Sequence, residues 1–139
     1  MGIASEIRGR GFTAHVWISH RFNDPYLWIL KKDFEHLIDK GRLAHGYIFF
    51  GEALAVQFQF AEAAANYLEN QNWGKAKTLL VDVLTIDAAT SAGIDTARSL
   101  SGFLWQKPIK SPKKTLILNI YIGELKFSFM AELPTIIKR

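Results

Sequence analysis

The spacing of hydrophobic residues changes several times along the chain, and each change marks a predicted element. Aromatic and β-branched residues crowd positions 11–20, which predicts a first strand. The segment after it places apolar residues three and four positions apart, which is typical of an amphipathic helix. Asp24 can cap this helix, Pro25 suits its first turn, and Gly41 stands just past its end. The sequence therefore predicts a helix from Pro25 to the residue before Gly41.

A period of two replaces the helical period in the next segment. Apolar residues alternate with alanine and glutamine over residues 53–60, as expected of a half-buried strand. Gly51 and Glu52 separate this run from residues 47–50, and glycine is favoured in the first central position of a tight hairpin turn. These two runs are therefore predicted to form a hairpin.

The rest of the chain predicts two helices, a strand and a second hairpin. The strand is apolar on both faces apart from Asp82, which is typical of a central strand, although its periodicity also fits a helix. In order, these elements are a helix (60–70), a strand (77–86), a helix (88–105), and a hairpin (115–133) turning at Gly123 and Glu124.

The predicted order is β-α-β-β-α-β-α-β-β, which indicates an α+β fold. We expect a largely antiparallel sheet of about five or six strands, with about three helices packed on it. Residues 1–139 are predicted to form a single globular domain, with a short basic tail at 134–139.

Composition narrows the function classes. The chain has 139 residues, of which 49% are hydrophobic and 22% charged, as in globular proteins. It contains no cysteine, which excludes a disulfide framework, a thiol nucleophile and a zinc site built on sulfur. The first ten residues lack the apolar core of a signal peptide, and no apolar run is long enough to span a membrane. We therefore expect a cytoplasmic protein without a membrane partner.

The excess positive charge is concentrated in one segment, residues 105–114, called here the lysine loop. The chain carries 17 basic and 13 acidic residues, and this loop alone supplies the lysines that make the difference. They are Lys107, Lys110, Lys113 and Lys114. We predict that the loop is a solvated connector, exposed and dispensable for folding.

The tetrapeptide from Ser111 to Lys114 gives the lysine loop a second interpretation. It resembles the short repeats of histone tails that bind the minor groove of AT-rich DNA. Several copies act together in those tails, whereas this chain has one. The resemblance implies weak, salt-dependent binding of nucleic acid.

Histidine spacing does not predict a metal site. Ligands on one strand lie two residues apart, and ligands on one helix usually lie four apart. His15, His20, His36 and His45 match neither spacing. A tertiary pair of His20 and His45 is left open.

Two kinds of nuclease site have residues of the right type. A metal-independent ribonuclease needs a base, an acid and a cation, which His20, Arg21, Glu35, His36 and Arg42 supply if they converge.

A magnesium nuclease is a further alternative, with Asp82, Glu124 and Lys126 in the roles of two carboxylates and an assisting lysine. The chain has no glycine-rich phosphate loop and no nucleophile elbow. We therefore expect no cofactor and lean against an enzyme.

Aromatic residues cluster where the first strand leads into the first helix. Trp17, Phe22, Tyr26 and Trp28, with Arg21 among them, have the composition of an interface anchor. The main hypothesis is a non-enzymatic protein-binding module, such as an immunity protein to a bacterial toxin or a phage-type inhibitor of a defence protein. The alternatives are a nucleic-acid-binding protein that uses the lysine loop, and a small metal-independent nuclease or toxin domain.

Overall fold

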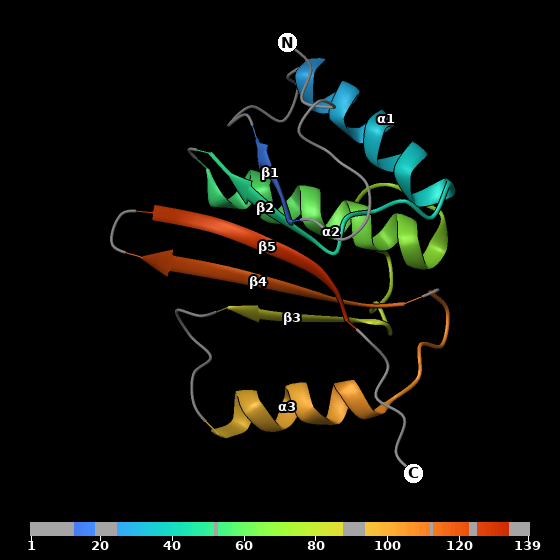
Figure 1. Ribbon diagram of the computed structural model, residues 1–139, viewed down its shortest axis with the longest axis vertical. Helices are drawn as coiled ribbons and strands as arrows, with labels where there is room; N and C mark the ends of the chain where they lie inside the picture. Colours follow the sequence, from blue (N-terminus) through green and yellow to red (C-terminus); the bar gives the residue numbers. More distant parts are fainter. Residues whose placement is uncertain are drawn as a thin grey trace.

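The computed structural model contains eight elements among the residues that it describes (Figure 1). The described residues are 13–18, 25–51, 53–87, 94–111, 113–122 and 125–133. The elements are β1 (Thr13–Trp17), α1 (Pro25–Asp39), β2 (Gly46–Phe50), α2 (Leu54–Asn70), β3 (Val83–Asp87), α3 (Ile94–Trp105), β4 (Lys114–Ile122) and β5 (Leu125–Leu133).

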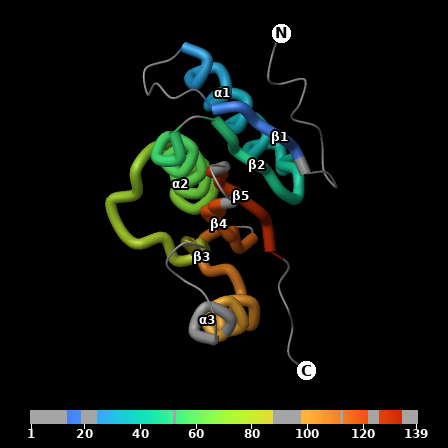
Figure 2. The backbone as a smooth tube through the Cα atoms, turned by 90° about the vertical axis from the view of Figure 1, so that its left-hand side faces the viewer, coloured from blue at the N-terminus to red at the C-terminus, as the bar shows by residue number. Residues whose placement is uncertain are grey.

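The five strands form one mixed sheet in the order β1-β2-β5-β4-β3. The pairs β2–β5 and β5–β4 are antiparallel, and the two outer pairs are parallel. Helix α2 packs across β2, β5 and β4, α1 packs on α2, and α3 contacts β3 at the other end of the sheet (Figures 1 and 2). The single α+β domain with five strands and three helices confirms the predicted fold class.

The strand predicted over residues 53–60 is wrong, because these residues form the first turns of α2. Val56, Gln57, Phe60, Ala61 and Ala64 are buried, which is a helical stripe and not an alternation. The period of two arose because half-exposed residues on the flank of the helix are also apolar. The alanine-rich segment that follows favours helix, and the helix extends back through the ambiguous run.

The other predicted elements are found with shorter bounds or a different place in the sheet. Register between β4 and β5 runs from Lys114–Leu133 to Ile122–Leu125, which confirms the second hairpin. Strand β3 begins six residues later than predicted and lies at an edge of the sheet, so the prediction of a central strand was wrong. Gly41 has a φ of +66°, the left-handed conformation expected just after α1.

Gly51 is required by a close approach between backbone segments. The amide of Ile18 donates a hydrogen bond of 2.8 Å to the carbonyl of Phe50, which brings the end of β1 against Gly51. A Cβ at position 51 would lie 2.2 Å from the carbonyl oxygen of Ile18, and the φ of Gly51 is +155°. Only glycine fits this junction between β2 and α2.

The core on the helical side of the sheet is built on aromatic rings. Phe34 of α1 lies 4.8 Å from Tyr47, 5.8 Å from Phe49 and 5.1 Å from Phe60, measured between ring centroids. All four side chains are buried. Rings in such tilted and edge-on pairs add to the free energy of burial. This cluster joins α1, β2 and α2 into one body.

Two buried carboxylates, called here the acid clamp, tie three segments together. Glu69 of α2 accepts hydrogen bonds of 2.9 and 2.8 Å from the amides of Val81 and Asp82. The Asp82 carboxylate accepts 2.6–2.7 Å hydrogen bonds from the backbone amides of the lysine loop at positions 109, 110 and 111. Hydrogen bonds to a charged acceptor are the strong ones. The clamp therefore fixes both the segment before β3 and the segment before β4.

We predict that Asp82→Asn lowers the free energy of unfolding by about 3 kcal/mol, because the amide has no charge and must turn an NH2 group toward backbone donors. Urea unfolding followed by circular dichroism measures this change. Asp39→Asn is the matched control, because Asp39 is exposed and accepts its hydrogen bonds from the Tyr67 hydroxyl. We expect it to cost about 1 kcal/mol or less. Equal losses in the two variants would contradict the clamp.

Burial makes Tyr47 sensitive to alkaline pH. Desolvation raises the pKa of Tyr47 from 10.0 to about 12, with the Ala44 amide opposing this shift and Glu132 adding to it. In the unfolded chain the phenol ionises near 10, so between pH 10 and 12 the unfolded state binds fewer protons. The stability contributed by neutral Tyr47 is therefore complete below pH 10 and is lost as pH rises toward 12.

We predict that Tyr47→Phe flattens this alkaline loss by about 2–3 kcal/mol. At pH 7 the variant should be less stable by about 1–3 kcal/mol, because the buried Ala44 amide loses its 2.8 Å hydrogen bond to the phenol oxygen. Unfolding measured at a series of pH values, for both proteins, isolates the difference. Parallel stability curves above pH 10 would show that Tyr47 is not buried as described.

Candidate functional site

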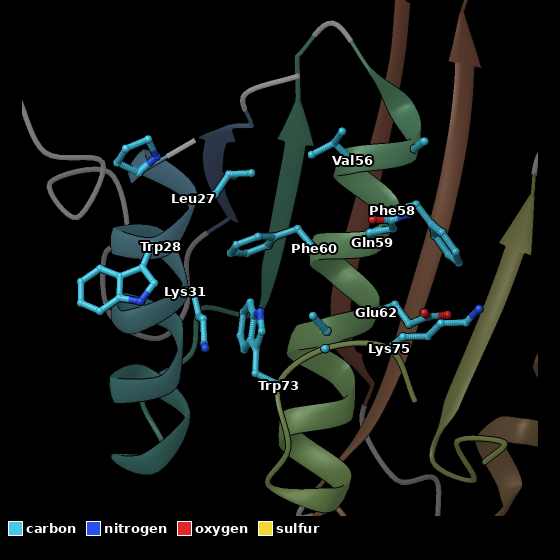
Figure 3. A pocket seen from close by; sticks show the side chains of 14 residues that line it. Leu27, Trp28, Lys31, Val56, Phe58, Gln59, Phe60, Glu62, Trp73 and Lys75 are labelled. Atoms are coloured by element: carbon cyan, nitrogen blue, oxygen red, sulfur yellow. The ribbon is translucent and has the colours of Figure 1, made fainter. Parts of the chain in front are cut away.

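A groove of about 810 Å³ lies along the outer side of α1 and α2, and is the candidate binding site (Figure 3). Leu27 comes from α1, Val56 and Phe60 come from α2, and Trp73 comes from the segment after α2. Figure 3 shows Leu27 and Phe60 in the space between the two helices, with Trp73 below them. The groove therefore has an apolar floor supplied by three separate segments.

The floor of the groove is anchored in the core. Val56 is 3% exposed and Phe60 is 7% exposed. The Phe60 ring meets Trp73 edge-on at 5.1 Å and Phe49 at 5.4 Å. A floor continuous with packed core rings is already formed before any ligand binds, which reduces the ordering cost of binding.

Its rim combines an exposed tryptophan with a few charges. Trp28 is 60% exposed, and Lys32 Nζ lies 5.3 Å from the centroid of its ring. Lys31, Glu62 and Lys75 also line the groove. An apolar, aromatic centre with a sparse charged rim is the composition of a protein-binding surface.

The predicted aromatic cluster is divided by the fold. Trp28 lines the groove, whereas Trp17 lies on β1, 43% exposed, with its ring 5.5 Å from that of Phe50. The Tyr26 hydroxyl donates a 2.9 Å hydrogen bond to the Trp17 carbonyl, so it braces α1 against β1. Arg21 and Phe22 lie outside the described residues.

The lysine loop is not the free connector that its composition predicts. Lys114 is 1% exposed, its Nζ donates a hydrogen bond to the Phe103 carbonyl, and burial lowers its pKa while Asp82 opposes the shift. Ser111 is 8% exposed and its amide is held by Asp82. The prediction of full exposure was wrong because the acid clamp draws the end of the loop into the domain. Lys107 and Lys110 are exposed, as expected.

The fold gives no support to DNA binding by the tetrapeptide that resembles histone-tail repeats. Ser111 and Lys114 are buried, and Pro112 lies outside the described residues. Lys113 is exposed but forms an ion pair of 3.4 Å with Glu132. Of this tetrapeptide, only Lys113 offers a solvent-accessible cation.

Among the described residues, no side-chain hydrogen bond or ion pair joins the residues considered for a ribonuclease site to one another. Glu35 contacts Lys32 at 3.7 Å, and His36, Arg42 and His45 are exposed. His20 lies outside the described residues. Within the described ranges, no three His, Asp or Glu side chains lie together in an arrangement that could hold a metal ion.

The magnesium-nuclease pattern is contradicted by the sheet register. The Asp82 carbonyl accepts a 2.9 Å hydrogen bond from Thr115, while Lys126 pairs with Tyr121 near the other end of β4. At the rise of a strand these two sites are roughly 20 Å apart. Glu124, the other carboxylate of the pattern, lies outside the described residues.

Sequence reasoning missed the groove, although it carried one usable signal. Trp73 stands alone in a polar stretch between α2 and β3, where a large aromatic residue is unusual for a connector. The assignment of residues 53–60 to a strand hid the floor, because it separated Val56 from the helical stripe to which it belongs.

Comparisons with known proteins give two partial matches. The chain is 30% identical over 102 residues to the DNA polymerase III subunit gamma/tau of Mycoplasma pneumoniae, and 28% identical over 103 residues to that of Mycoplasma genitalium. Each match covers 65% of this chain, but the chain spans only 15% and 17% of the two proteins. No protein-family model matches, and no solved structure is significantly similar. None of the helices that the structure describes is long and apolar enough to cross a membrane.

Proposed function

We propose that this chain is a non-enzymatic docking domain of a replication protein, and that its groove binds another subunit of DNA polymerase III. The observation that carries this proposal is the groove itself, with a preformed apolar floor and the exposed Trp28 at its rim. Exposed aromatic anchors beside a desolvated floor are the usual energetic centre of a protein interface.

The proposed role in replication is based on the comparisons with known proteins. Both curated matches are named as a subunit of DNA polymerase III, and a subunit must contact other subunits. The chain matches only a fraction of each protein, as expected of one docking module within a larger polypeptide. The activity of those whole proteins is not part of the proposal.

The groove is suited to an apolar segment of its partner, such as one face of an amphipathic helix. Residues of two helices line the groove, and its charged residues, Lys31, Glu62 and Lys75, lie among apolar ones. Helix-in-groove recognition uses this combination of apolar anchors and peripheral charge.

An immunity protein to a toxin, or an inhibitor of a defence protein, would also use a docking groove. These roles agree with the groove equally well, but the named matches favour polymerase assembly over them. Identifying the protein that binds in the groove therefore distinguishes these functions.

We predict that the chain binds one subunit of the DNA polymerase III encoded in its own genome, and that Trp28→Ala weakens this complex by at least about tenfold. Isothermal titration calorimetry with each purified subunit measures the affinity. Trp28 is mostly solvent-exposed, so its removal should leave the melting temperature nearly unchanged.

Trp17→Ala is the matched control, because Trp17 is another exposed tryptophan that does not line the groove. It should bind as the unmodified chain does. If Trp17→Ala abolished binding and Trp28→Ala did not, the docking site would be the β1–β2 face of the sheet. If no polymerase subunit bound, the polymerase role would be refuted, and a toxin or defence protein that bound through Trp28 would take its place.

A further inference from the structure

A second exposed surface lies where the segment before β3 meets the segment before β4. Leu79 is 88% exposed, Val81 is 41% exposed and Ile109 is 76% exposed. Single exposed apolar residues are common, but apolar residues that gather into one patch with polar residues at its margin are typical of an interaction site. We call these three residues, with Lys77, Lys107 and Lys110, the lysine–leucine surface.

The acid clamp brings the two halves of this surface together. Asp82 directly follows Val81, and its carboxylate oxygen lies 2.7 Å from the amide nitrogen of Ile109. In Figure 1 the segments enter β3 and β4 at the same edge of the sheet. Leu80, between the two exposed aliphatic residues, packs against the core instead. The alternation turns Leu79 and Val81 outward on a fixed backbone.

Charge on this surface has one sign. Residues 71–81 and 105–113 contain no acid, and Lys77, Lys107 and Lys110 are exposed. The two nearest carboxylates in these contacts, Glu69 and Asp82, are 7% and 2% exposed and are occupied by backbone amides. The surface therefore carries three exposed lysines and no acid of its own. Lys110 Nζ contacts the Asn70 amide oxygen at 3.4 Å, and Asp39 lines the same hollow as Lys110.

We propose that the lysine–leucine surface binds a short peptide segment in which acidic residues alternate with apolar ones. Lysines complement the acids, and Leu79, Val81 and Ile109 complement the apolar side chains. A nucleic acid would satisfy the lysines but not the aliphatic residues, because bases stack on aromatic rings and arginine planes. This second site goes beyond the groove, which shares none of these six residues.

Selection from a phage library of random dodecapeptides tests the proposal with the full chain. We expect enriched peptides to combine aspartate or glutamate with leucine, isoleucine or phenylalanine. The most enriched peptide, labelled with fluorescein, then serves as the probe in anisotropy titrations. Enrichment of peptides without acids, or no enrichment, would overturn the proposal.

Two variants separate the apolar and the charged parts of the surface. Leu79→Ser with Ile109→Ser, and Lys77→Glu with Lys107→Glu, should each weaken the labelled peptide by at least about tenfold. Circular dichroism melting verifies that both variants fold. Because the changed side chains are exposed, we expect little loss of stability.

The controls make the groove and this surface distinguishable. Ile29→Ser with Lys40→Ser removes an exposed aliphatic residue and a lysine elsewhere, and should leave peptide binding unchanged. The groove variant Trp28→Ala should also bind the peptide normally. If Trp28→Ala alone lost the peptide, the groove would be the site and this proposal would fail.

Binding of a mixed-sequence single-stranded oligonucleotide tests whether the surface is a nucleic-acid site instead. We expect it to bind more weakly than the peptide and not to displace it. If the oligonucleotide displaced the peptide, and only the lysine variant lost it, the surface would be a nucleic-acid site and the peptide proposal would be wrong.

Discussion

The Asp82 carboxylate holds together the segments that lead into β3 and β4. A single carboxylate accepts hydrogen bonds from three consecutive amides of the lysine loop, while the Asp82 carbonyl binds the amide of Thr115 in β4. Glu69 fixes the same segment to α2. Because buried carboxylates are costly unless they are fully hydrogen-bonded, the two acids and the amides around them stabilise one another or fail together. Lys114, buried nearby, depends on the same arrangement, since Asp82 opposes the loss of its charge.

The same buried carboxylates also determine which charged groups reach the surface in this region. Glu69 and Asp82 are buried and bind backbone amides, whereas the six residues of the lysine–leucine surface remain exposed. On the other side of α2, the aromatic core continues through Phe60 to Trp73 and forms the floor of a groove whose charges are sparse and mixed. One small domain thus presents two surfaces of different chemistry, an apolar groove with mixed charges and an aliphatic surface with lysines only.

The spacing of apolar residues correctly predicted the elements that have one apolar and one polar face. Helix α1 and the β4–β5 hairpin have clear periods and clear end signals, such as Gly41 after α1. Residues 53–60 were misjudged, because Phe58 on the flank of α2 repeats the apolar pattern of a strand. The candidate site depended on tertiary contacts. Asp82 appeared only as an interruption in an apolar run, and nothing in its neighbours along the chain indicates that it binds amides 27 to 29 residues away. Trp28 was anticipated from aromatic clustering, but Trp73, which lines the same groove, was not.

Amide hydrogen exchange, measured residue by residue with NMR, tests the acid clamp most directly. The Ile109 side chain is 76% exposed and Lys110 is exposed, so an unclamped lysine loop would exchange its amides at the rate of an unstructured peptide. The account predicts strong protection of the amides of Ile109, Lys110 and Ser111, and weak protection of the amide of Lys107. Exchange of all four at the unstructured rate would contradict it.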